Sequence, residues 1–355
     1  MISFKKLLSS EKKVVGVDIG STSLKLAEIS GSRGEYTLDK LARIPLERGV
    51  IKNGLLEDPA TFANTIKTLF KTSGCKTKNV VTALPGHSVI IKKATFAAAE
   101  EEELSEQIIE GASEYLPFDN IENIDFDLHI IGGNELNPAQ VDIVIAAAKH
   151  DVIQTYRDAF KKAGYNLVIL DVDSFALETA YEENYEFENN DVVILINMGA
   201  SITNINALKG GCSVFTRNIL QGGDTITDVL KDKLGVSFEA AEDAKLSGVE
   251  SQGFTADDLI AYGEPIFQEI ERSIDFFMST SGGFFMKQVI LSGGCAHLPG
   301  ITTALGDKLH CEIDLFDPFK NINYDKNIFS SDYITDIAPT AALTVGLALR
   351  RMDDK

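Results

Sequence analysis

Tryptophan is absent from this 355-residue sequence, and only four cysteines and five histidines occur in it. The cysteines (Cys75, Cys212, Cys295 and Cys311) lie far apart, and none belongs to a CxxC pair or has a pair of histidines nearby. The histidines show no spacing typical of metal ligands. These patterns argue against a disulfide framework and a zinc site, and they are typical of reduced thiols in the cytoplasm.

Long hydrophobic runs are also lacking. The longest uncharged stretches, residues 192–208 and 288–306, are each interrupted by asparagine, glycine or proline, so neither has the pattern of a transmembrane helix. No signal-peptide pattern opens the sequence. We therefore expect a cytoplasmic protein.

Positive charge is scarce relative to negative charge. Lysine and arginine number 33 against 53 aspartates and glutamates, which gives a formal net charge of -20. Such a surface disfavours broad contact with nucleic acid, so we expect no nucleic-acid partner. A nucleotide site is not excluded, because charges more than about 8 Å away are screened at physiological salt.

The order of predicted elements indicates an α/β protein with an internal duplication. A chain of this length usually forms two domains. An apolar strand, a polar residue, a glycine, a hydroxyl-rich turn and a second strand occupy residues 14–30, and the same order recurs from residue 191. Two α/β domains that each begin in this way would present their turns to a common cleft.

Two of these turns have the composition of phosphate-binding loops. In residues 18–25, "DIGSTSLK", the glycine allows close backbone approach and three hydroxyls supply donors: Gly20, Ser21, Thr22 and Ser23. Lys25 lies two residues after Ser23 on the returning strand, so both side chains point to one side. In residues 197–203, "NMGASIT", Gly199 takes the matching position. Backbone N–H groups, hydroxyls and one acid suit a triphosphate with Mg²⁺.

Two further glycine-rich stretches complete the set. In "GGDTITDVL", residues 222–230, two glycines precede a predicted helix whose N-terminus would face an anion. In "VILSGGCAHLPGI", residues 289–301, an apolar strand leads into Gly293 and Gly294, where missing side chains leave room for a flat ring. Each stretch alone is a weak signal, whereas the four in this order are specific.

The four stretches resemble the phosphate-1, phosphate-2, second connecting and adenosine motifs of the actin-like ATPase superfamily. "AAEDAKLSG" adds Glu242 and Lys245, which share one helix face and match a pair that holds ribose and adenine in related chaperone ATPases. "ILDVDSFALETAY" is similar to the first connecting helix, with Asp173 at the position of a water-positioning acid or amide. The resemblance implies a two-lobed fold of duplicated RNase H-like domains that binds ATP and Mg²⁺.

Within this superfamily the chain resembles the branch that contains the FtsA and PilM families, and the PilM family more closely. The resemblance rests on "VVTALPGHSVIIKK" and "EYLPFDNIENIDFD", and we expect no C-terminal membrane-targeting helix like that of FtsA. It implies a leader at residues 1–13 and a first lobe at residues 14–90 with 166–190. An inserted subdomain is expected at residues 91–165. The second lobe, whose last helix returns toward the first, is expected at residues 191–230 with 288–355, and a helical subdomain at residues 231–287.

The resemblance also assigns roles to individual residues. It implies catalytic roles for Asp18, Asp173 and Asn197, with Asp18 facing Mg²⁺ through water. It implies nucleotide contacts from Gly20, Ser21, Thr22, Ser23, Lys25, Gly199, Ala200, Ser201, Thr203, Gly222, Gly223, Glu242, Lys245, Gly293, Gly294 and Leu298.

Simpler explanations exist for several of these residues. Asp18 would alternatively cap a turn, and Lys25 would be an exposed strand lysine. Asp173 would alternatively be a helix N-cap, with Asp171 as the competing catalytic acid. Two further side-chain groups have ordinary structural explanations. Glu178 is expected to be a solvated helix acid, and the aromatic cluster of Phe276, Phe277, Phe284 and Phe285 to be core rather than a partner-facing patch.

One position departs from the superfamily pattern. Relatives usually carry aspartate at the start of the second phosphate turn, whereas this chain has Asn197. Loss of one well-placed polar contribution to a transition state commonly costs about 100-fold or more in rate. We therefore expect tight ATP binding with slow hydrolysis, so that the nucleotide holds the two lobes in one orientation.

Three functions follow from these observations. The resemblance to the PilM family implies a scaffold of the type IV pilus machine. The scaffold would receive the N-terminal cytoplasmic tail of the inner-membrane protein PilN in a groove between the first subdomain and the insertion. It would also contact other pilus components and associate with the inner membrane through its partner. The alternatives are a filament-forming protein of cell division or cell shape and a small-molecule kinase of the same fold.

Overall fold

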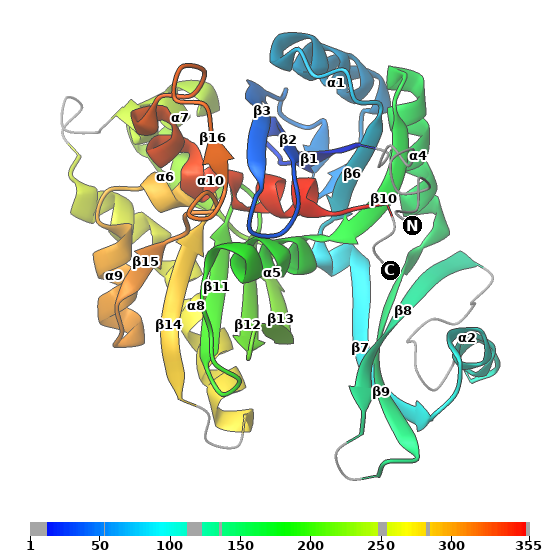
Figure 1. Ribbon diagram of the computed structural model, residues 1–355. Coiled ribbons are helices and arrows are strands. Elements are labelled where there is room, and N and C mark those ends of the chain that lie inside the picture. Colours follow the sequence, from blue (N-terminus) through cyan, green and yellow to red (C-terminus); the bar gives the residue numbers. More distant parts are fainter. Residues whose placement is uncertain are drawn as a thin grey trace.

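Two β-sheets with the same strand order form the centre of the protein in a computed structural model (Figure 1). The structure describes residues 13–52, 54–111, 123–134, 137–247, 254–281 and 285–352. The predictions for residues 1–12 and for Phe284 therefore lie outside the described residues. Among the described helices, none combines the length and the apolar character that crossing a membrane requires.

The first sheet has the order β10-β6-β1-β2-β3-β16 and the second the order β13-β12-β11-β14-β15. The strands of the first are β1 (Val14–Ile19), β2 (Ser23–Ser30), β3 (Thr37–Pro45), β6 (Asn79–Leu84), β10 (Asn166–Val172) and β16 (Asn323–Tyr324). The strands of the second are β11 (Val192–Met198), β12 (Thr203–Lys209), β13 (Cys212–Ile219), β14 (Met286–Ser292) and β15 (Ile313–Leu315).

The strand directions confirm the predicted duplication and the α/β fold class. In the first sheet β2 is antiparallel to both β1 and β3, while β6 is parallel to β1 and β10 is parallel to β6. In the second sheet β11, β12, β13, β14 and β15 repeat these directions in the same order. Because β1 and β11 lie in the middle, both faces are covered and their residues are almost continuously apolar.

Helices cover the outer face of each sheet. On the first sheet these are α1 (Pro59–Ser73) and α4 (His150–Ala163), whose side chains share a core with β1 and β2. On the second they are α6 (Gly223–Leu234), α7 (Phe238–Ser247), α8 (Ala256–Thr280) and α9 (Ile301–Leu309). Helix α1 begins sharply because the Asp58 carboxylate accepts hydrogen bonds from the N–H groups of Ala60 and Thr61.

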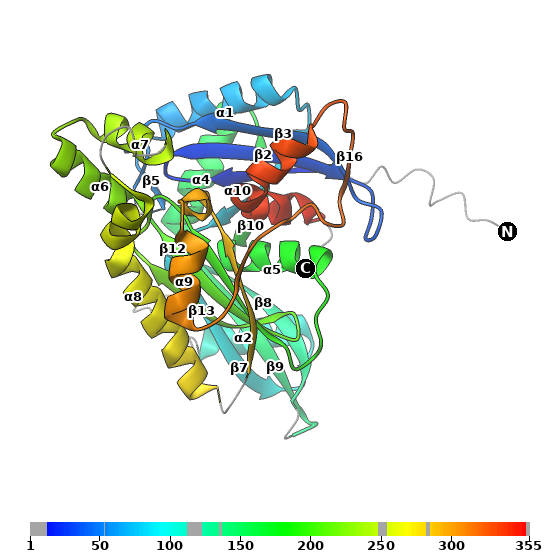
Figure 2. The same cartoon turned by 90° about the vertical axis from the view of Figure 1, so that its left-hand side faces the viewer.

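Two further helices pack between the two sheets. Helix α5 (Asp173–Asn184) follows β10 of the first sheet but packs mainly on the second sheet. Helix α10 (Ser331–Leu349) comes after β15 of the second sheet and β16 of the first, and it packs on the first sheet. The two helices lie side by side between the lobes (Figures 1 and 2).

Two glycines permit this arrangement. A Cβ at Gly16 of β1 would lie 2.5 Å from the backbone nitrogen of Ala348 in α10. A Cβ at Gly346 of α10 would lie 1.7 Å from the carbonyl oxygen of Ala176 in α5. Helix α10 therefore contacts both β1 and α5 at backbone distance.

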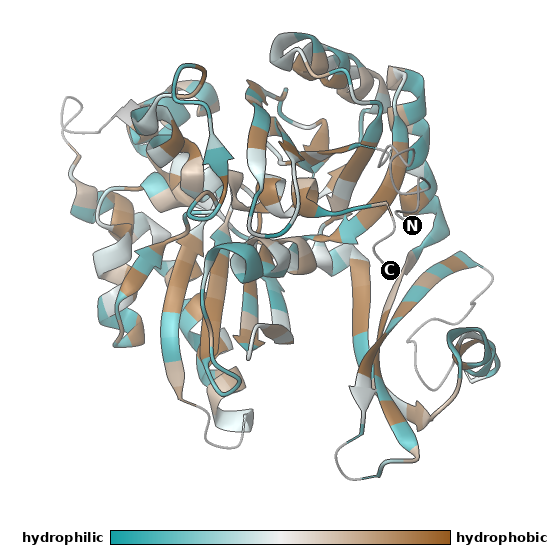
Figure 3. Cartoon of the chain, viewed as in Figure 1, coloured by the Kyte–Doolittle hydropathy of each residue, from teal (hydrophilic) through white to brown (hydrophobic). Residues whose placement is uncertain are grey.

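A smaller three-stranded sheet lies to one side of the two lobes (Figure 1). It consists of β7 (Val89–Ala97), β8 (Ile124–Gly133) and β9 (Gln140–Lys149), and α2 (Glu101–Glu110) covers one of its faces. Strand β8 alternates hydrophobic and hydrophilic residues along its length, as expected for a strand with one covered face (Figure 3). The 3-10 helix η2 (Gly86–Ser88) connects this sheet to β6, and a short hairpin of β4 (Ile51–Lys52) and β5 (Leu55–Leu56) lies before α1.

The division of the chain into subdomains remains a prediction, and two expectations need revision. Helix α4 was placed in the insertion of residues 91–165, but it packs in the core of the first lobe, so a boundary near Lys149 describes the packing better. The aromatic cluster is expected to be core, but of its three described members only Phe277 is buried, while Phe276 and Phe285 are 56% and 83% exposed. Neighbouring helix residues point about 100° apart, so Phe276 and Phe277 cannot both face the core.

We expect Gly346→Val to lower the free energy of unfolding by about 3 kcal/mol or more, because the added Cβ meets a backbone carbonyl that no side-chain rotation relieves. Thermal denaturation followed by circular dichroism measures the change. Gly133→Ala is the matched control, since no atom lies within 4 Å of its added Cβ. Equal melting temperatures for the two variants would contradict the assigned contact between α5 and α10.

Candidate functional site

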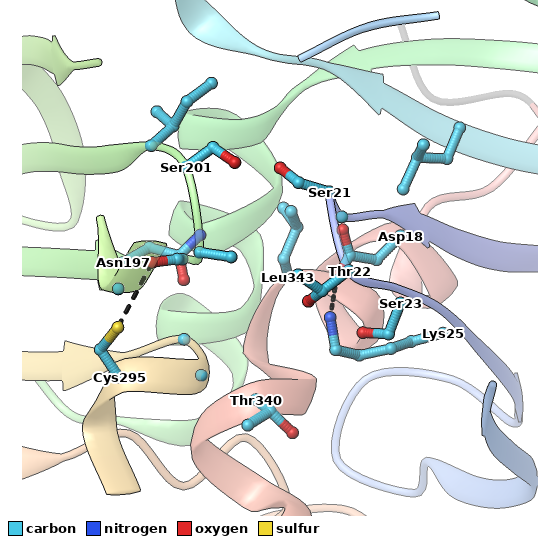
Figure 4. Close-up of a pocket in the computed structure, with 18 of the residues that line it drawn as sticks. Asp18, Ser21, Thr22, Ser23, Lys25, Asn197, Ser201, Cys295, Thr340 and Leu343 are labelled. Atoms are coloured by element: carbon cyan, nitrogen blue, oxygen red, sulfur yellow. Dashed lines mark hydrogen bonds and ion pairs between the residues drawn. The ribbon is translucent and has the colours of Figure 1, made fainter. Parts of the chain in front are cut away.

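A cavity of about 280 Å³ lies between the two lobes and receives residues from both (Figure 4). This volume is close to the lower end of the roughly 300–1,000 Å³ typical of ligand sites. The predicted site residues that line it are Asp18, Gly20, Ser21, Thr22, Ser23, Lys25, Asp173, Asn197, Gly199, Ala200, Ser201, Gly223, Glu242, Lys245, Gly293, Gly294 and Leu298. The fold thus brings all four glycine-rich stretches to one place, while the role of each residue remains a prediction.

The two phosphate-type turns have the same local geometry. The Gly20 N–H donates to the carbonyl of Ser23 at 3.1 Å, and the Gly199 N–H donates to the carbonyl of Ile202 at 2.9 Å. A Cβ at either glycine would lie 3.0 Å from that same carbonyl oxygen. Ser21 and Ser201, the latter from the second turn, face each other across the cavity (Figure 4). Such a pair of turns can enclose a polyphosphate from two sides.

Asp18 and Lys25 form an ion pair on the wall of the first lobe. They are directly opposite each other in the register of β1 and β2, which places both side chains on one face. The Lys25 Nζ lies 2.7 Å from the Asp18 Oδ2, and both side chains are largely buried. The described partner of the Asp18 carboxylate is thus a lysine rather than a backbone N–H of the turn, which argues against a turn-capping role.

Asp173 is held by donors from three directions. Its carboxylate accepts hydrogen bonds from the N–H of Gly86 at 3.1 Å, the N–H of Ser174 at 2.7 Å and the Asn204 side-chain amide at 3.4 Å. Burial raises the pKa of Asp173 to about 6 despite these bonds, and the charges of Asp171 and Asp18 act in the same direction. A carboxyl group with this pKa lining a cavity is suited to accept a proton.

The structure distinguishes Asp173 from Asp171 at the start of α5. Val172 is the N-cap of α5, so Asp173 occupies the first helical position rather than the cap. The Asp171 carboxylate lies 2.6 Å from the Nε of Arg350 and is outside the cavity lining. Asp173 is therefore the better candidate for a catalytic acid. Glu178, which is expected to be a solvated helix acid, is half-buried, and desolvation, with a contribution from the charge of Glu182, raises its pKa to about 8.

The turn of Gly293 and Gly294, which resembles the adenosine motif, packs closely against β11. Gly293 has a φ of +91°, and a Cβ there would lie 2.4 Å from the carbonyl oxygen of Met198 and 2.7 Å from the Asn197 Oδ1. Its N–H donates to the carbonyl of Pro339 in α10 at 2.9 Å. Only glycine fits both the backbone conformation and the space at position 293, so the cavity wall there consists of backbone atoms.

Glu242 and Lys245 form the expected pair on one face of α7. The Lys245 Nζ lies 2.7 Å from the Glu242 Oε2, and it also donates to the carbonyl of Gly223 at 3.1 Å and the Thr227 hydroxyl at 2.8 Å. Lys245 is only 7% exposed. The pair therefore fixes the start of α6 against α7 at the edge of the cavity.

Two predicted residues lie behind the cavity wall instead of lining it. The buried Thr203 hydroxyl donates to the carbonyl of Gln221 at 2.9 Å. A Cβ at Gly222 would lie 2.4 Å from the carbonyl oxygen of Gly199, so this glycine lets α6 approach the second turn. Both residues support the turn that the other site residues form.

Sequence reasoning missed several residues that line the cavity. Asn204 is opposite Asn197 in the register of β11 and β12, as Lys25 is opposite Asp18, so the duplication alone could have identified it. Arg43 is the partner of Lys25 on β3. Thr340 and Leu343 reach the cavity from α10, and no local sequence signal announces them.

Almost the whole chain is similar to known proteins. Residues 16–352 match the family model described as type IV pilus assembly protein PilM. A solved PilM-PilN type IV pilus biogenesis complex is similar, with a TM-score of 0.85, 26% identity, and coverage of 97% of this chain and 100% of that chain.

More distant structures share the fold. Ethanolamine utilization protein EutJ from Carboxydothermus hydrogenoformans has a TM-score of 0.55 at 17% identity and covers 94% of this chain and 88% of its own. MreB5 of Spiroplasma citri bound to AMPPNP has a TM-score of 0.53 at 12% identity and covers 94% of each chain. At these identities the two structures show the actin-like ATPase fold alone.

The raised pKa of Asp173 predicts a pH-dependent effect on stability. The folded state holds this proton more tightly than the unfolded chain, so the stabilisation is full below about pH 4 and is lost as the pH rises through about 6. The free energy of unfolding of Asp173→Asn, relative to that of wild type, should therefore increase by on the order of 2 kcal/mol from pH 4.5 to pH 8. Urea denaturation at both pH values measures the difference. Asp171→Asn, which breaks the pair with Arg350, should lose stability at pH 8. An Asp173→Asn effect that does not change with pH would refute the prediction.

Proposed function

The chain belongs to the type IV pilus assembly protein PilM family, and on that premise we propose that it is an ATP-binding scaffold of a type IV pilus assembly machine. The observation that carries the proposal is the convergence of four separate glycine-rich stretches on one cavity between the lobes. The actin-like fold and the likeness to a PilM-PilN complex support it.

The triphosphate would lie between the turns of Gly20 and Gly199. Their backbone N–H groups and the serine and threonine hydroxyls supply donors, and Lys25 supplies a positive charge once it leaves Asp18. Glu242 and Lys245 would hold the ribose and base beside the backbone wall of Gly293 and Gly294. The relative MreB5, which has the same fold, was solved with AMPPNP, and this supports a nucleotide as the ligand.

Mg²⁺ fits this donor set when the nucleotide is present. Within the described part of the chain, no group of three or more His, Cys, Asp or Glu side chains could hold a metal by itself. Mg²⁺ is usually held by one or two carboxylates together with phosphate oxygens and water. Asp18 would provide the carboxylate, through water, and Asn197 would provide a neutral amide on the opposite wall.

Hydrolysis is proposed to be slow. Asn197 lacks the negative charge that relatives carry at this position, so the second wall stabilises the metal less. The bound nucleotide would then act mainly by holding the lobes together around α5 and α10. A turnover of about 1 per second or faster, as in ordinary kinases, would contradict this part of the proposal.

The partner is proposed to be the N-terminal cytoplasmic peptide of PilN, bound between the first lobe and the inserted sheet. The likeness to the PilM-PilN complex supports this choice. Through this partner the protein would lie at the inner face of the inner membrane and contact other pilus components. The sheet face that α2 leaves uncovered offers apolar side chains at Ile91 and Val144, which point away from the α2 core.

ATP binding tests the assignment of Asp18 and Lys25. Lys25→Ala should weaken ATP binding about 10- to 100-fold with or without Mg²⁺, because a charged hydrogen bond to phosphate is lost. Asp18→Ala should weaken binding only with Mg²⁺, and in EDTA it should bind at least as tightly as wild type, because Lys25 is no longer neutralised. Calorimetric titration measures both, with the exposed Lys71→Ala as the control. Unchanged affinity in both site variants would defeat the assignment.

Peptide binding tests the proposed partner. A labelled synthetic peptide of the PilN N-terminal tail should bind the wild-type protein in a fluorescence anisotropy titration. Ile91→Glu and Val144→Glu should each weaken binding about 10-fold or more, because a charge replaces apolar contact area. Ile109→Glu, on the exposed side of α2, is the control and should bind normally. Wild-type affinity in the first two variants would exclude this face.

A further inference from the structure

Lysines gather at one end of the first lobe, although the protein as a whole has a net charge of -20. Strands β1, β6 and β10 are parallel neighbours, and their first residues, Val14, Asn79 and Asn166, are aligned in register. The chain segments that lead into these three strands therefore lie side by side. They carry five exposed lysines, which we call the lysine face: Lys13, Lys71, Lys76, Lys78 and Lys161.

The lysine face lies at the opposite end of these strands from the cavity. Asp18 near the end of β1 and Asp173 just after β10 line the cavity, whereas Lys13 precedes β1. The beginning of β1 lies on the right in Figure 2, while α6 and α7 lie on the left. A strand of six residues spans about 20 Å, so these lysines do not belong to the cavity.

Neighbouring acids do not neutralise the lysine face. Within the described ranges of the chain, none of its five lysines takes part in an ion pair. Lys162 is left out of the face, because its charge interacts with the carboxylate of Asp58. Glu28, an acid that contacts the segment before β6, is buried and accepts a hydrogen bond from the Thr77 hydroxyl. Five positive charges therefore face solvent together.

The helix dipole explains only part of this pattern. Lys71 and Lys161 lie in the last turns of α1 and α4, where a positive charge is favourable in any helix. The other three lysines lie outside helices, in the segments before β1 and β6. The Lys78 ammonium lies 4.2 Å from the centroid of the Tyr165 ring, a contact that leaves its charge in place.

The segment that precedes the lysine face has the composition of a peptide that binds a membrane surface. Residues 1–12 contain three lysines, one acid and, after Met1, four apolar side chains: Ile2, Phe4, Leu7 and Leu8. This segment joins the described chain at Lys13, within the lysine face. Met352 is 40% exposed at the same end, where its Sδ lies 3.9 Å from the Asn79 Nδ2. Positive charge and apolar side chains thus occur together here.

An anionic lipid surface fits these features better than a nucleic acid does. Lysines attract anionic headgroups, and apolar side chains enter the interface beneath them. A phosphate backbone offers no comparable place for leucine and phenylalanine. The acidic remainder of the protein does not prevent the contact, because a flat membrane meets one end only and charges more than about 8 Å away are screened.

We propose that the lysine face, together with residues 1–12, binds directly to a membrane surface rich in anionic lipid. Each lysine near such a surface strengthens binding about fivefold, so five lysines give a reversible attachment. This proposal goes beyond the proposed function, because the attachment requires neither a nucleotide nor a protein partner. It would turn the carboxyl ends of the strands, and with them the cavity, away from the membrane.

Vesicle sedimentation without nucleotide tests the proposal. The full-length protein should sediment with phosphatidylcholine vesicles that contain about 30% phosphatidylglycerol, and it should not sediment with vesicles of phosphatidylcholine alone. Raising NaCl to about 0.5 M should release it, because the Debye length shortens to about 4 Å.

Two double variants test the lysine face. Lys71→Glu with Lys76→Glu should weaken binding to the anionic vesicles about 25-fold or more. Lys52→Glu with Lys149→Glu is the matched control, because it changes the charge equally at exposed positions that precede α1 and α4. The control should bind within about threefold of wild type. Both variants should keep the wild-type melting temperature, since all four side chains are exposed.

A third double variant tests the leader. Leu7→Ser with Leu8→Ser should weaken vesicle binding about 10-fold or more, because less apolar area enters the interface. Wild-type affinity in this variant would refute the contribution of residues 1–12.

Four results would overturn the lipid proposal: no sedimentation of wild type with anionic vesicles, equal sedimentation with neutral vesicles, wild-type affinity in Lys71→Glu with Lys76→Glu, or an equal loss in the control. Tighter binding to a DNA duplex than to the vesicles, measured by fluorescence anisotropy, would assign the face to nucleic acid instead. Failure to bind ATP in a calorimetric titration would overturn only the proposed function.

Discussion

The close crossing of α5 and α10 is the constraint on which the rest of the structure depends. Helix α5 follows β10 of the first sheet and packs mainly on the second, while α10 lies beyond the strands of the second sheet in the chain and packs on the first, so neither lobe has a complete core without the other half of the chain. The crossing is possible because Gly346 has no side chain where it meets the backbone of Ala176. The cavity lies beside these helices, with Thr340 and Leu343 of α10 in its lining. A ligand bound in this cavity would contact both lobes and the element that joins them.

The duplication gives the cavity two walls with the same strand geometry, one from each sheet, that differ in charge. Across the first sheet one row of partners is Asp18, Lys25 and Arg43, and across the second the equivalent row is Asn197, Asn204 and Asn218. One wall therefore carries charge and the other carries amides. Charged groups suit metal and phosphate, whereas neutral amides donate and accept hydrogen bonds without adding charge.

Much of the fold could be predicted from the sequence, because its signals are local. A glycine and hydroxyls between two apolar runs define a hairpin turn, and the hairpin itself sets the register that pairs Asp18 with Lys25. The convergence of the four glycine-rich stretches on one cavity was expected from the resemblance to a known superfamily and not from local physical signals in the sequence. What could not be predicted depends on distant partners. The partial burial of Glu178, the exposure of Phe276 and the packing of α4 are decided by elements far away along the chain.

The outer strand β16 and helix α10 have a consequence for how the protein is made. Residues 319–349 supply much of the core that covers Ala27, Ile29 and Leu38 of the first sheet. During synthesis, the strands that carry Ala27, Ile29 and Leu38 must therefore wait, with this apolar face uncovered, until residues 319–349 have also been translated. Nascent chains of this kind are prone to aggregate and are typical clients of chaperones. The first lobe is thus expected to complete its core only after the strands of the second lobe have been synthesised.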